Sequence, residues 1–259
     1  MKISCIQMDM RLADADYNYS HVQTLVKEAM ADSPDVLVLP ETWNTGFFPR
    51  ENLTACCDEN CTRTKDIIGG LAKEYNVNIV AGSVSSLRDG KVYNTCCVFD
   101  RSGECIASYD KTHRFTPMGE DNFYEAGDHL CRFTLDGVSC AIIICYDIRF
   151  PELTRALALP GLDLLFVVSQ WPAVRTMHLQ TLTRARAIEN QMFLACCNSC
   201  GTAGETVYGG SSVILDPWGA ELAQAGTSEQ TITAELDLGI LTQIRGSIPV
   251  FRDRRPELY

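Results

Sequence analysis

Cys145 ends a short apolar stretch, and its position suggests reactivity more than that of any other residue in the chain. The stretch from Cys140 to Ile144 is uninterrupted and rich in branched residues, which is typical of a buried strand. Directly after Cys145 the chain becomes polar, and Pro151 then opens a segment of good helix formers. A thiol between a buried strand and a helix projects into a cleft beside free backbone N–H groups. This position fits a nucleophile, although most buried cysteines are inert core residues.

Three charged residues follow predicted strands or lie in the loops between them. Glu41 directly follows one buried strand, Lys111 follows another, and Glu120 lies in the loop after Lys111. Each residue alone is typical of a cap or a solvated surface charge. Together with the Cys145 thiol they supply a nucleophile, a base, a cation and a second acid, which is a complete set for covalent catalysis.

Composition limits the classes of partner. The net charge is −11 and no Lys/Arg cluster interrupts the acidic background, so the sequence argues against nucleic-acid binding. No apolar run is long enough to span a bilayer, and the first residues carry no signal-peptide core, so we expect no membrane association. A length of 259 residues with 46% hydrophobic residues is enough to bury the core of one large α/β domain.

The thirteen cysteines favour a reducing compartment. Their number is odd and several are adjacent in sequence, as at Cys56–Cys57 and Cys196–Cys197, which does not suit a disulfide framework. We therefore predict a cytoplasmic protein. Some of these cysteines could be combined into a zinc site, but they do not form paired C-x₂-C motifs, so we predict no bound metal.

The hydrophobic pattern alternates between strands and helices. The predicted strands cover residues 2–8, 35–39, 78–81, 92–100, 105–110, 133–135, 139–144, 164–169, 192–198, 212–216 and 231–236. The predicted helices cover residues 19–31, 61–75, 152–159 and 176–190. Strands joined by helices, with hairpins inserted, imply a sheet covered by helices on one face, and two such halves would pack sheet to sheet. Because no linker or repeat interrupts the chain, we expect a single domain over residues 1–259.

Three segments resemble a known family. Residues 39–47 (LPETWNTGF), 109–115 (YDKTHRF) and 144–152 (ICYDIRFPE) are similar, in order and spacing, to the blocks that hold the Glu–Lys–Cys triad of the nitrilase (carbon–nitrogen hydrolase) superfamily. The resemblance extends from Met1 to about Leu238. It implies an α/β fold, the four-layer α-β-β-α sandwich of the nitrilase type. It also implies a homodimer or larger homo-oligomer, and no metal or organic cofactor.

Within that superfamily the chain looks most like the omega-amidase branch. The similarity lies in Trp171-Pro172 with Arg175 and His178, in residues 185–191 and 197–198, and in the ending at residues 251–259. This resemblance implies hydrolysis of the terminal amide of short dicarboxylic-acid monoamides such as 2-oxoglutaramate and succinamate. We expect residues 245–259 to form a C-terminal tail at a subunit interface.

The resemblance also implies roles for the charged residues. Glu41 would take the proton of Cys145, whose thiolate would attack the amide carbon. Lys111 and the backbone N–H of Tyr146 would stabilise the oxyanion. Glu120 would orient the substrate and Lys111, with Glu125 as the competing choice for this second glutamate.

The free carboxylate of such a substrate requires a cation in the pocket. Arg175 is the candidate because a guanidinium binds a carboxylate with two hydrogen bonds. Trp171, Phe47 and Tyr146 would line the acyl chain. Arg149 and Glu152 are expected to brace the helix after Cys145 as an ion pair.

Other interpretations stay open at this point. An N-carbamoyl-amino-acid hydrolase or a nitrilase would retain Glu41, Lys111 and Cys145, and only a substrate panel would separate these activities. A non-catalytic thiol redox sensor is a further alternative that the many cysteines suggest. A Cys–His dyad with His113 or His178 is disfavoured, because the resemblance implies Glu, not His, as the base.

Overall fold

The computed structural model describes residues 1–47 and 49–258, and two β-sheets form its centre. The larger sheet has eight strands in the order β16-β1-β2-β4-β6-β5-β3, with β7 paired to β6. Its strands are β1 Lys2–Gln7, β2 Val36–Val38, β3 Asp58–Glu59, β4 Asn78–Val80, β5 Val84–Arg88, β6 Lys91–Phe99, β7 Cys105–Asp110 and β16 Gln230–Glu235.

The smaller sheet has six strands in the order β15-β14-β11-β10-β9-β8. Its strands are β8 Arg132–Leu135, β9 Val138–Ile144, β10 Leu164–Ser169, β11 Phe193–Asn198, β14 Val213–Leu215 and β15 Glu221–Gln224. The central strands β9, β10 and β11 run parallel to one another. A separate hairpin joins β12 Thr202–Ala203 to β13 Thr206–Val207.

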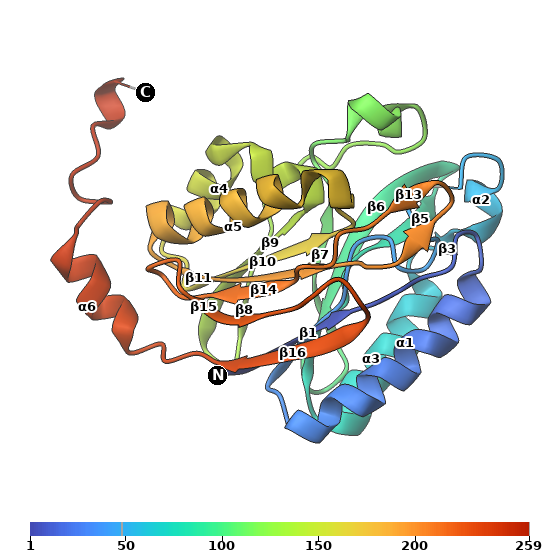
Figure 1. The fold of residues 1–259 in the computed structure, drawn as a ribbon, viewed down its shortest axis with the longest axis horizontal. Coiled ribbons are helices and arrows are strands. Elements are labelled where there is room, and N and C mark those ends of the chain that lie inside the picture. The colour runs from blue at the N-terminus through green and yellow to red at the C-terminus, as the bar shows by residue number, and fades with distance from the viewer. Residues whose placement is uncertain (48, 259) are drawn as a thin grey trace.

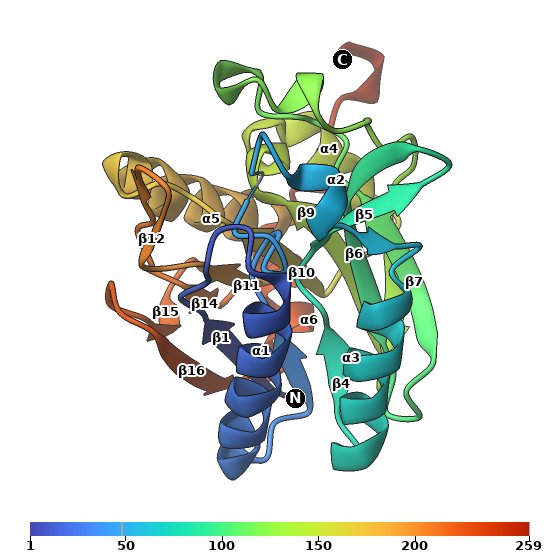
Figure 2. The ribbon, with the colours of Figure 1, turned by 90° about the vertical axis from the view of Figure 1, so that its right-hand side faces the viewer.

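Helices cover the outer face of each sheet (Figure 1). The α-helices are α1 Ala15–Ala29, α2 Leu53–Cys56, α3 Thr62–Tyr75, α4 Pro151–Ala158, α5 Thr176–Asn190 and α6 Ile240–Ser247. The 3₁₀ helices are η1 Met30–Asp32, η2 Thr116–Met118, η3 Glu120–Asn122, η4 Cys145–Arg149, η5 Ala173–Arg175 and η6 Pro256–Leu258. Helices α1 and α3 lie side by side against the larger sheet (Figure 2), whereas α4 and α5 pack on the smaller one.

Alternation along β2 shows how the layers are built. Val36 and Val38 belong to the core cluster that contains the residues of β9 and β10, whereas Leu37 and Leu39 belong to the cluster with α1 and α3. Successive side chains of a strand point to opposite faces, so one strand contributes to both cores. The two sheets therefore pack face to face with helices outside, which confirms the predicted α-β-β-α sandwich.

Every predicted helix and strand is present in the structure, but several short or weakly patterned elements were not predicted. Helix α5 and strands β7 and β10 have the predicted bounds, and the other predicted elements differ by a few residues at their ends. The sequence pattern missed the short elements β3, β12, β13 and α2, and also β5, β15 and α6. Strand β5 carries buried Ser85 and Ser86 instead of apolar residues, and β15 is an edge strand with little burial. No helix of the described residues combines the length and apolar character that crossing a bilayer requires.

Candidate active site

Cys145 lies where β9 ends and the chain turns into η4. Its φ is +48°, a left-handed conformation that is uncommon for a residue with a side chain. The turn is held by Asp147, whose Oδ2 accepts a hydrogen bond of 3.0 Å from the backbone N–H of Ile144. Helix α4 begins shortly afterwards at Pro151, as predicted. The thiol is therefore fixed at a sharp strand-to-helix turn.

Asp147 also ties this turn to the loop that carries Lys111. Its Oδ2 accepts a hydrogen bond of 2.8 Å from the Tyr109 hydroxyl, and its Oδ1 accepts one of 2.9 Å from the backbone N–H of His113. The His113 ring lies 2.8 Å from the same oxygen and stacks on Phe150. The ring of His113 thus bonds Asp147 and not the thiol, which argues against a Cys–His dyad.

Glu41 follows β2 and is fully buried between the two sheets. Its Oε1 accepts hydrogen bonds from Lys111 Nζ at 2.8 Å and from Asn94 Nδ2 at 2.9 Å. Its Oε2 accepts one from the backbone N–H of Gln170 at 2.8 Å. The carboxylate also contacts the thiol of Cys145. Residues from the larger and the smaller sheet therefore meet at this carboxylate.

Lys111 lies between two buried carboxylates. Its Nζ is 2.9 Å from both carboxylate oxygens of Glu120, in addition to its bond to Glu41. Glu125 is partly exposed and pairs with Lys91 at 3.6 Å. Of the two glutamates that the sequence left open, Glu120 is thus the one beside Lys111.

The buried charges shift one another's protonation. Burial raises the pKa of Cys145, and the negative charge of Glu41 raises it further, while Lys111 opposes both effects. Burial also raises the pKa of the Glu120 carboxyl, although Lys111 counteracts it. Burial alone would lower the pKa of Lys111, but the charges of Glu120 and Glu41 outweigh it and leave its pKa raised. Lys111 therefore stays an ammonium, and Cys145 is a thiol until a base removes its proton.

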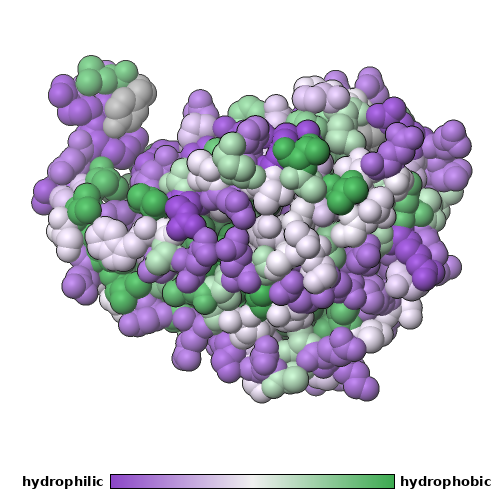
Figure 3. Space-filling view, viewed as in Figure 1, coloured by the Kyte–Doolittle hydropathy of each residue, from purple (hydrophilic) through white to green (hydrophobic). Residues whose placement is uncertain are grey.

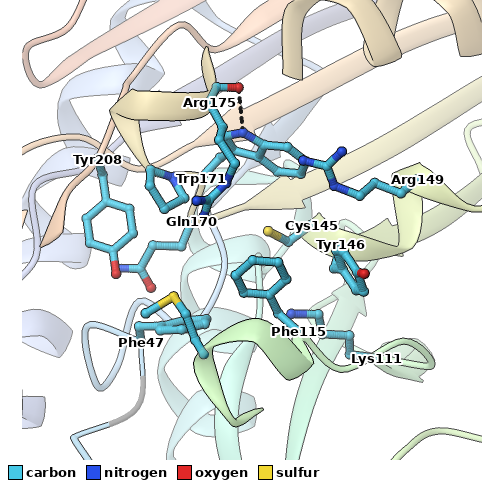
Figure 4. A pocket seen from close by; sticks show the side chains of 12 residues that line it. Phe47, Lys111, Phe115, Cys145, Tyr146, Arg149, Gln170, Trp171, Arg175 and Tyr208 are labelled. Atoms are coloured by element: carbon cyan, nitrogen blue, oxygen red, sulfur yellow. Dashed lines mark hydrogen bonds between the residues drawn. The ribbon is translucent and has the colours of Figure 1, made fainter. Parts of the chain in front are cut away.

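A small pocket opens at Cys145. Figure 4 shows its side chains, which come from loops of both sheets. The lining residues are Phe47, Lys111, Phe115, Met118, Cys145, Tyr146, Arg149, Gln170, Trp171, Pro172, Arg175 and Tyr208.

All four residues predicted to bind substrate line this pocket. Trp171 Nε1 donates a hydrogen bond of 2.8 Å to the backbone carbonyl of Arg175, which fixes the indole against η5 (Figure 4). The guanidinium of Arg175 lies over the ring of Phe115, 5.2 Å from its centroid. Tyr146 packs edge-on against the same ring at 5.0 Å. Phe47 completes the set on the side of Lys111.

Arg149 is a pocket residue that sequence reasoning missed. We expected an ion pair with Glu152, but in the described residues no such pair forms. Instead the guanidinium of Arg149 lies 4.7 Å from the centroid of the Trp171 ring and hydrogen-bonds His178 at 3.2 Å. The η4 turn changes the direction of side chains after Cys145, so helical spacing does not predict where Arg149 points.

Gln170 and Tyr208 were also missed. The backbone N–H of Gln170 donates a hydrogen bond to Glu41. The only sign in the sequence that Gln170 lies in the pocket is that it directly precedes Trp171. Tyr208 reaches the pocket from the chain after β13. No periodic pattern marks either residue.

The remaining cysteines and the acidic residues form no metal site in the described part of the chain. No group of three or more His, Cys, Asp or Glu side chains is arranged there to hold an ion. All thirteen cysteines are free thiols.

Comparison with known proteins places the chain in a family. The carbon–nitrogen hydrolase family model matches residues 2–246. The chain is 41% identical to a 2-oxoglutaramate amidase of Bacillus subtilis over 99% of this chain and 98% of the relative, and 33% identical to the omega-amidase NIT2 of Danio rerio over 100% and 96%. A solved amidase from Nesterenkonia, with acrylamide added at its active-site cysteine, superimposes with a TM-score of 0.89 at 26% identity over 100% of this chain and 98% of that one. The chain therefore belongs to the carbon–nitrogen hydrolase (nitrilase) family, in its omega-amidase-like branch.

Proposed function

We propose that this protein is a thiol amidohydrolase that releases ammonia from the terminal amide of short dicarboxylic-acid monoamides of the 2-oxoglutaramate and succinamate type. One observation carries the proposal: Cys145 contacts Glu41 within reach of the Lys111 charge, and the same pocket holds two guanidinium groups. The names of the relatives support this choice of substrate.

Acylation begins with transfer of the Cys145 proton to Glu41. The raised pKa of Cys145 keeps the thiol protonated at neutral pH, so attack on the amide carbon is coupled to this transfer. Lys111 and the backbone N–H of Tyr146 stabilise the oxyanion, and each such donor is worth roughly 3–4 kcal/mol of barrier. Protonated Glu41 then gives its proton to the departing ammonia, which leaves a thioester on Cys145.

Deacylation uses the same residues in reverse. Water enters, Glu41 removes its proton, and the resulting hydroxide cleaves the thioester to release the acid and the thiol. Glu120 holds Lys111 in place through both carboxylate oxygens and accepts a hydrogen bond from the backbone N–H of Phe115. Glu120 thus acts as a positioning residue that holds the ammonium where the oxyanion forms.

The two arginines select the far end of the substrate. Arg175 is the carboxylate clamp that the sequence predicts, and Arg149 presents a second guanidinium on the Trp171 side of the pocket (Figure 4). A guanidinium forms charge-assisted, bidentate hydrogen bonds with a carboxylate. The rings of Phe47, Tyr146 and Trp171 enclose the short acyl chain between the clamp and the thiol.

A substrate panel tests the proposal. Ammonia release is measured with 2-oxoglutaramate, succinamate, a neutral amide of equal length, an N-carbamoyl amino acid and a nitrile. We expect kcat/KM to be highest for the two monoamides that carry a carboxylate. Higher kcat/KM for the N-carbamoyl compound or the nitrile would favour the alternative activities of this family. Absence of turnover with every monoamide would reject the substrate class.

We also propose that residues 1–259 act as one cytoplasmic domain that assembles as a homodimer or larger homo-oligomer through its tail. The chain after α6 extends as an arm at the upper left of Figures 1 and 3. Ile248 and Leu258 on this segment are exposed, while Tyr259 lies outside the described residues. Apolar side chains on a protruding segment are covered by assembly. Light scattering on the full chain and on a chain ending at residue 247 tests this: only the full chain should be oligomeric, and equal masses would reject the role of the tail.

A further inference from the structure

Three cysteines far from the pocket form a row across the larger sheet. Cys61 precedes α3, Cys97 lies in β6 and Cys105 begins β7. The thiol of Cys97 is the common neighbour of the Cys61 and Cys105 thiols and interacts with both. Cys61 and Cys97 are buried, whereas Cys105 is exposed. This thiol row (Cys61, Cys97 and Cys105) therefore connects the surface to the interior.

The strand register explains why these thiols meet. Strands β6 and β7 are antiparallel, with Cys97 opposite Ser108 and Phe99 opposite Cys105 across an irregular step. Cys97 and Phe99 point to the face that α3 covers, so Cys61 at the start of α3 approaches the same side (Figure 2). Cys96 points to the opposite face and belongs to the other core cluster. Of the two adjacent cysteines, only Cys97 therefore belongs to the thiol row.

The exposed member of the row also has a lowered pKa. A hydrogen bond from Cys97, helped by the charge of Lys65, lowers the pKa of Cys105 to about 7. Burial raises the pKa of Cys131 to about 11 and that of Cys57 to about 12. The thiolate is the form that reacts with oxidants, and an accessible thiolate reacts first.

We propose that the thiol row is a peroxide-reactive modification site in which Cys105 is oxidised and Cys97 resolves it as a disulfide. The Cys105 thiolate attacks one oxygen of hydrogen peroxide, forming an S–O bond while the O–O bond breaks and, with one proton, water leaves. The sulfur loses two electrons and peroxide gains them. The Cys97 thiol then attacks the sulfenic sulfur, and a second water leaves as the Cys97–Cys105 disulfide forms.

Cys61 allows the disulfide to move inward. Its thiolate attacks the Cys97 sulfur, a Cys61–Cys97 bond forms, and the Cys105 thiolate leaves with the bonding electrons of the broken S–S bond. The lower pKa of Cys105 makes it the better leaving group. The result is a covalent link between α3 and β6 and a regenerated surface thiolate. None of the three residues lines the pocket at Cys145, so this site does not depend on the amidase reaction.

Peptide mapping of the oxidised full chain tests the proposal. The reduced protein is treated with hydrogen peroxide, the remaining thiols are blocked with an alkylating agent, and the chain is cut with trypsin. Cys61, Cys97 and Cys105 then lie on the separate peptides 51–63, 92–101 and 102–111. The first peptide also contains Cys56 and Cys57, and the second also contains Cys96. We expect residues 92–101 to be disulfide-linked to residues 102–111 or 51–63, both in the wild type and in a Cys145→Ala background.

Matched variants identify the sulfur. Cys96→Ala and Cys97→Ala remove neighbouring buried thiols, and only Cys97→Ala should abolish the link. The surface variant Cys105→Ser should slow peroxide-dependent loss of the Cys97 thiol at least about tenfold and leave ammonia release by the reduced enzyme unchanged. If Cys97→Ala does not fold, the rate of peroxide-dependent loss of the Cys97 thiol in Cys105→Ser tests the proposal by itself. A link that persists without Cys97 or Cys105, or Cys105 that ends as an unlinked sulfinic acid, would overturn the proposal.

Discussion

The molecule contains two clusters in which one cation lies between two carboxylates, and they differ mainly in access to water. In the buried charge cluster, Lys111 Nζ is 2.8 Å from Glu41 and 2.9 Å from Glu120. The exposed charge cluster consists of Arg101 with Asp35 and Asp136, at 2.8 Å and 2.6 Å. The exposed fraction of the side chains is at most 1% in the first cluster and 30–42% in the second. The distances between cation and carboxylates are therefore nearly equal in the two clusters, although one cluster is buried and the other is in contact with water.

The pKa of a carboxyl group shifts in opposite directions in the two clusters because one of them is buried. Hydrogen bonding from the backbone N–H of Lys2, with help from Arg101, lowers the pKa of Asp35. Burial raises the pKa of Glu120 despite its bonds to Lys111. Water and hydrogen bonds stabilise the charged form in the exposed cluster, whereas the interior penalises it.

The difference indicates what each cluster contributes. The exposed cluster connects the turns near β2, β6 and β8 through the ion pairs of Arg101. Arg101 also donates a hydrogen bond to the carbonyl of Asn76, between α3 and β4. Such a pair adds little to stability. The buried cluster costs desolvation energy and is best explained by the reaction, which needs a base and an ammonium held beside Cys145.

Glu41→Gln should give the largest contrast between the clusters. The amide keeps the size of the side chain but cannot take the thiol proton, so both acylation and thioester hydrolysis should stall and kcat fall by about 10²–10⁴-fold. The matched change Asp136→Asn should leave kcat within about twofold. Steady-state ammonia release measures both. Normal kinetics for Glu41→Gln would remove Glu41 as the base.

Lys111→Met and Arg101→Met compare the two cations. Removing Lys111 leaves two buried carboxylates without their partner, so the free energy of unfolding should fall by about 3–5 kcal/mol, and loss of an oxyanion donor should lower kcat by about 10²–10³-fold. Arg101→Met should cost about 1 kcal/mol or less without changing kcat. Urea unfolding and activity assays measure these effects. Equal stability losses would contradict the role assigned to burial.

Arg175→Ala tests a cation of intermediate exposure. Loss of the guanidinium should raise KM for succinamate by roughly 10–100-fold, which corresponds to one charge-assisted pair. KM for a neutral amide of the same length should change much less. Arg149→Ala, measured on the same two substrates, shows how the two arginines share the carboxylate. Equal effects on both substrates would leave Arg175 without a role as the clamp.

The pH dependence of stability should have opposite signs in the two clusters. Because the pKa of Asp35 is lowered on folding, its stabilisation is present above pH 3.8 and is lost as the pH falls through the folded value. At neutral pH the Asp35→Asn variant should be less stable than the wild type by a few tenths of a kcal/mol, and this difference should disappear on acidification. The pKa of Glu120 is raised, so its proton-linked stabilisation is present below pH 4.5 and is lost as the pH rises through the folded value.

Glu120→Gln should consequently become less stable relative to the wild type as the pH falls. Chemical unfolding of both variants and the wild type between pH 3 and 7 measures the two slopes. The same sign for both variants would break the contrast between the buried and the exposed carboxyl groups.

The sequence predicts the positions of the reactive residues better than their surroundings. Glu41, Lys111 and Cys145 each follow a predicted strand, which places them at strand ends, and the packing of the two sheets brings these ends together. The positive φ of Cys145 and the hydrogen bonds of Asp147 could not be predicted, because they depend on a turn without periodicity. For the same reason Arg149 was assigned to the helix surface instead of the pocket. Asn94 lies in the middle of β6, where a polar residue gives no sign of its distant partner Glu41.

The most direct test of the central claim is the activity of Cys145→Ala. Alanine keeps the Cβ atom, so the left-handed backbone at this position gains no new strain and the fold should be retained. Circular dichroism should match the wild type, while ammonia release from 2-oxoglutaramate should fall by at least about 10⁴-fold. A folded Cys145→Ala protein that still releases ammonia at the wild-type rate would contradict hydrolysis through a thioester at this sulfur.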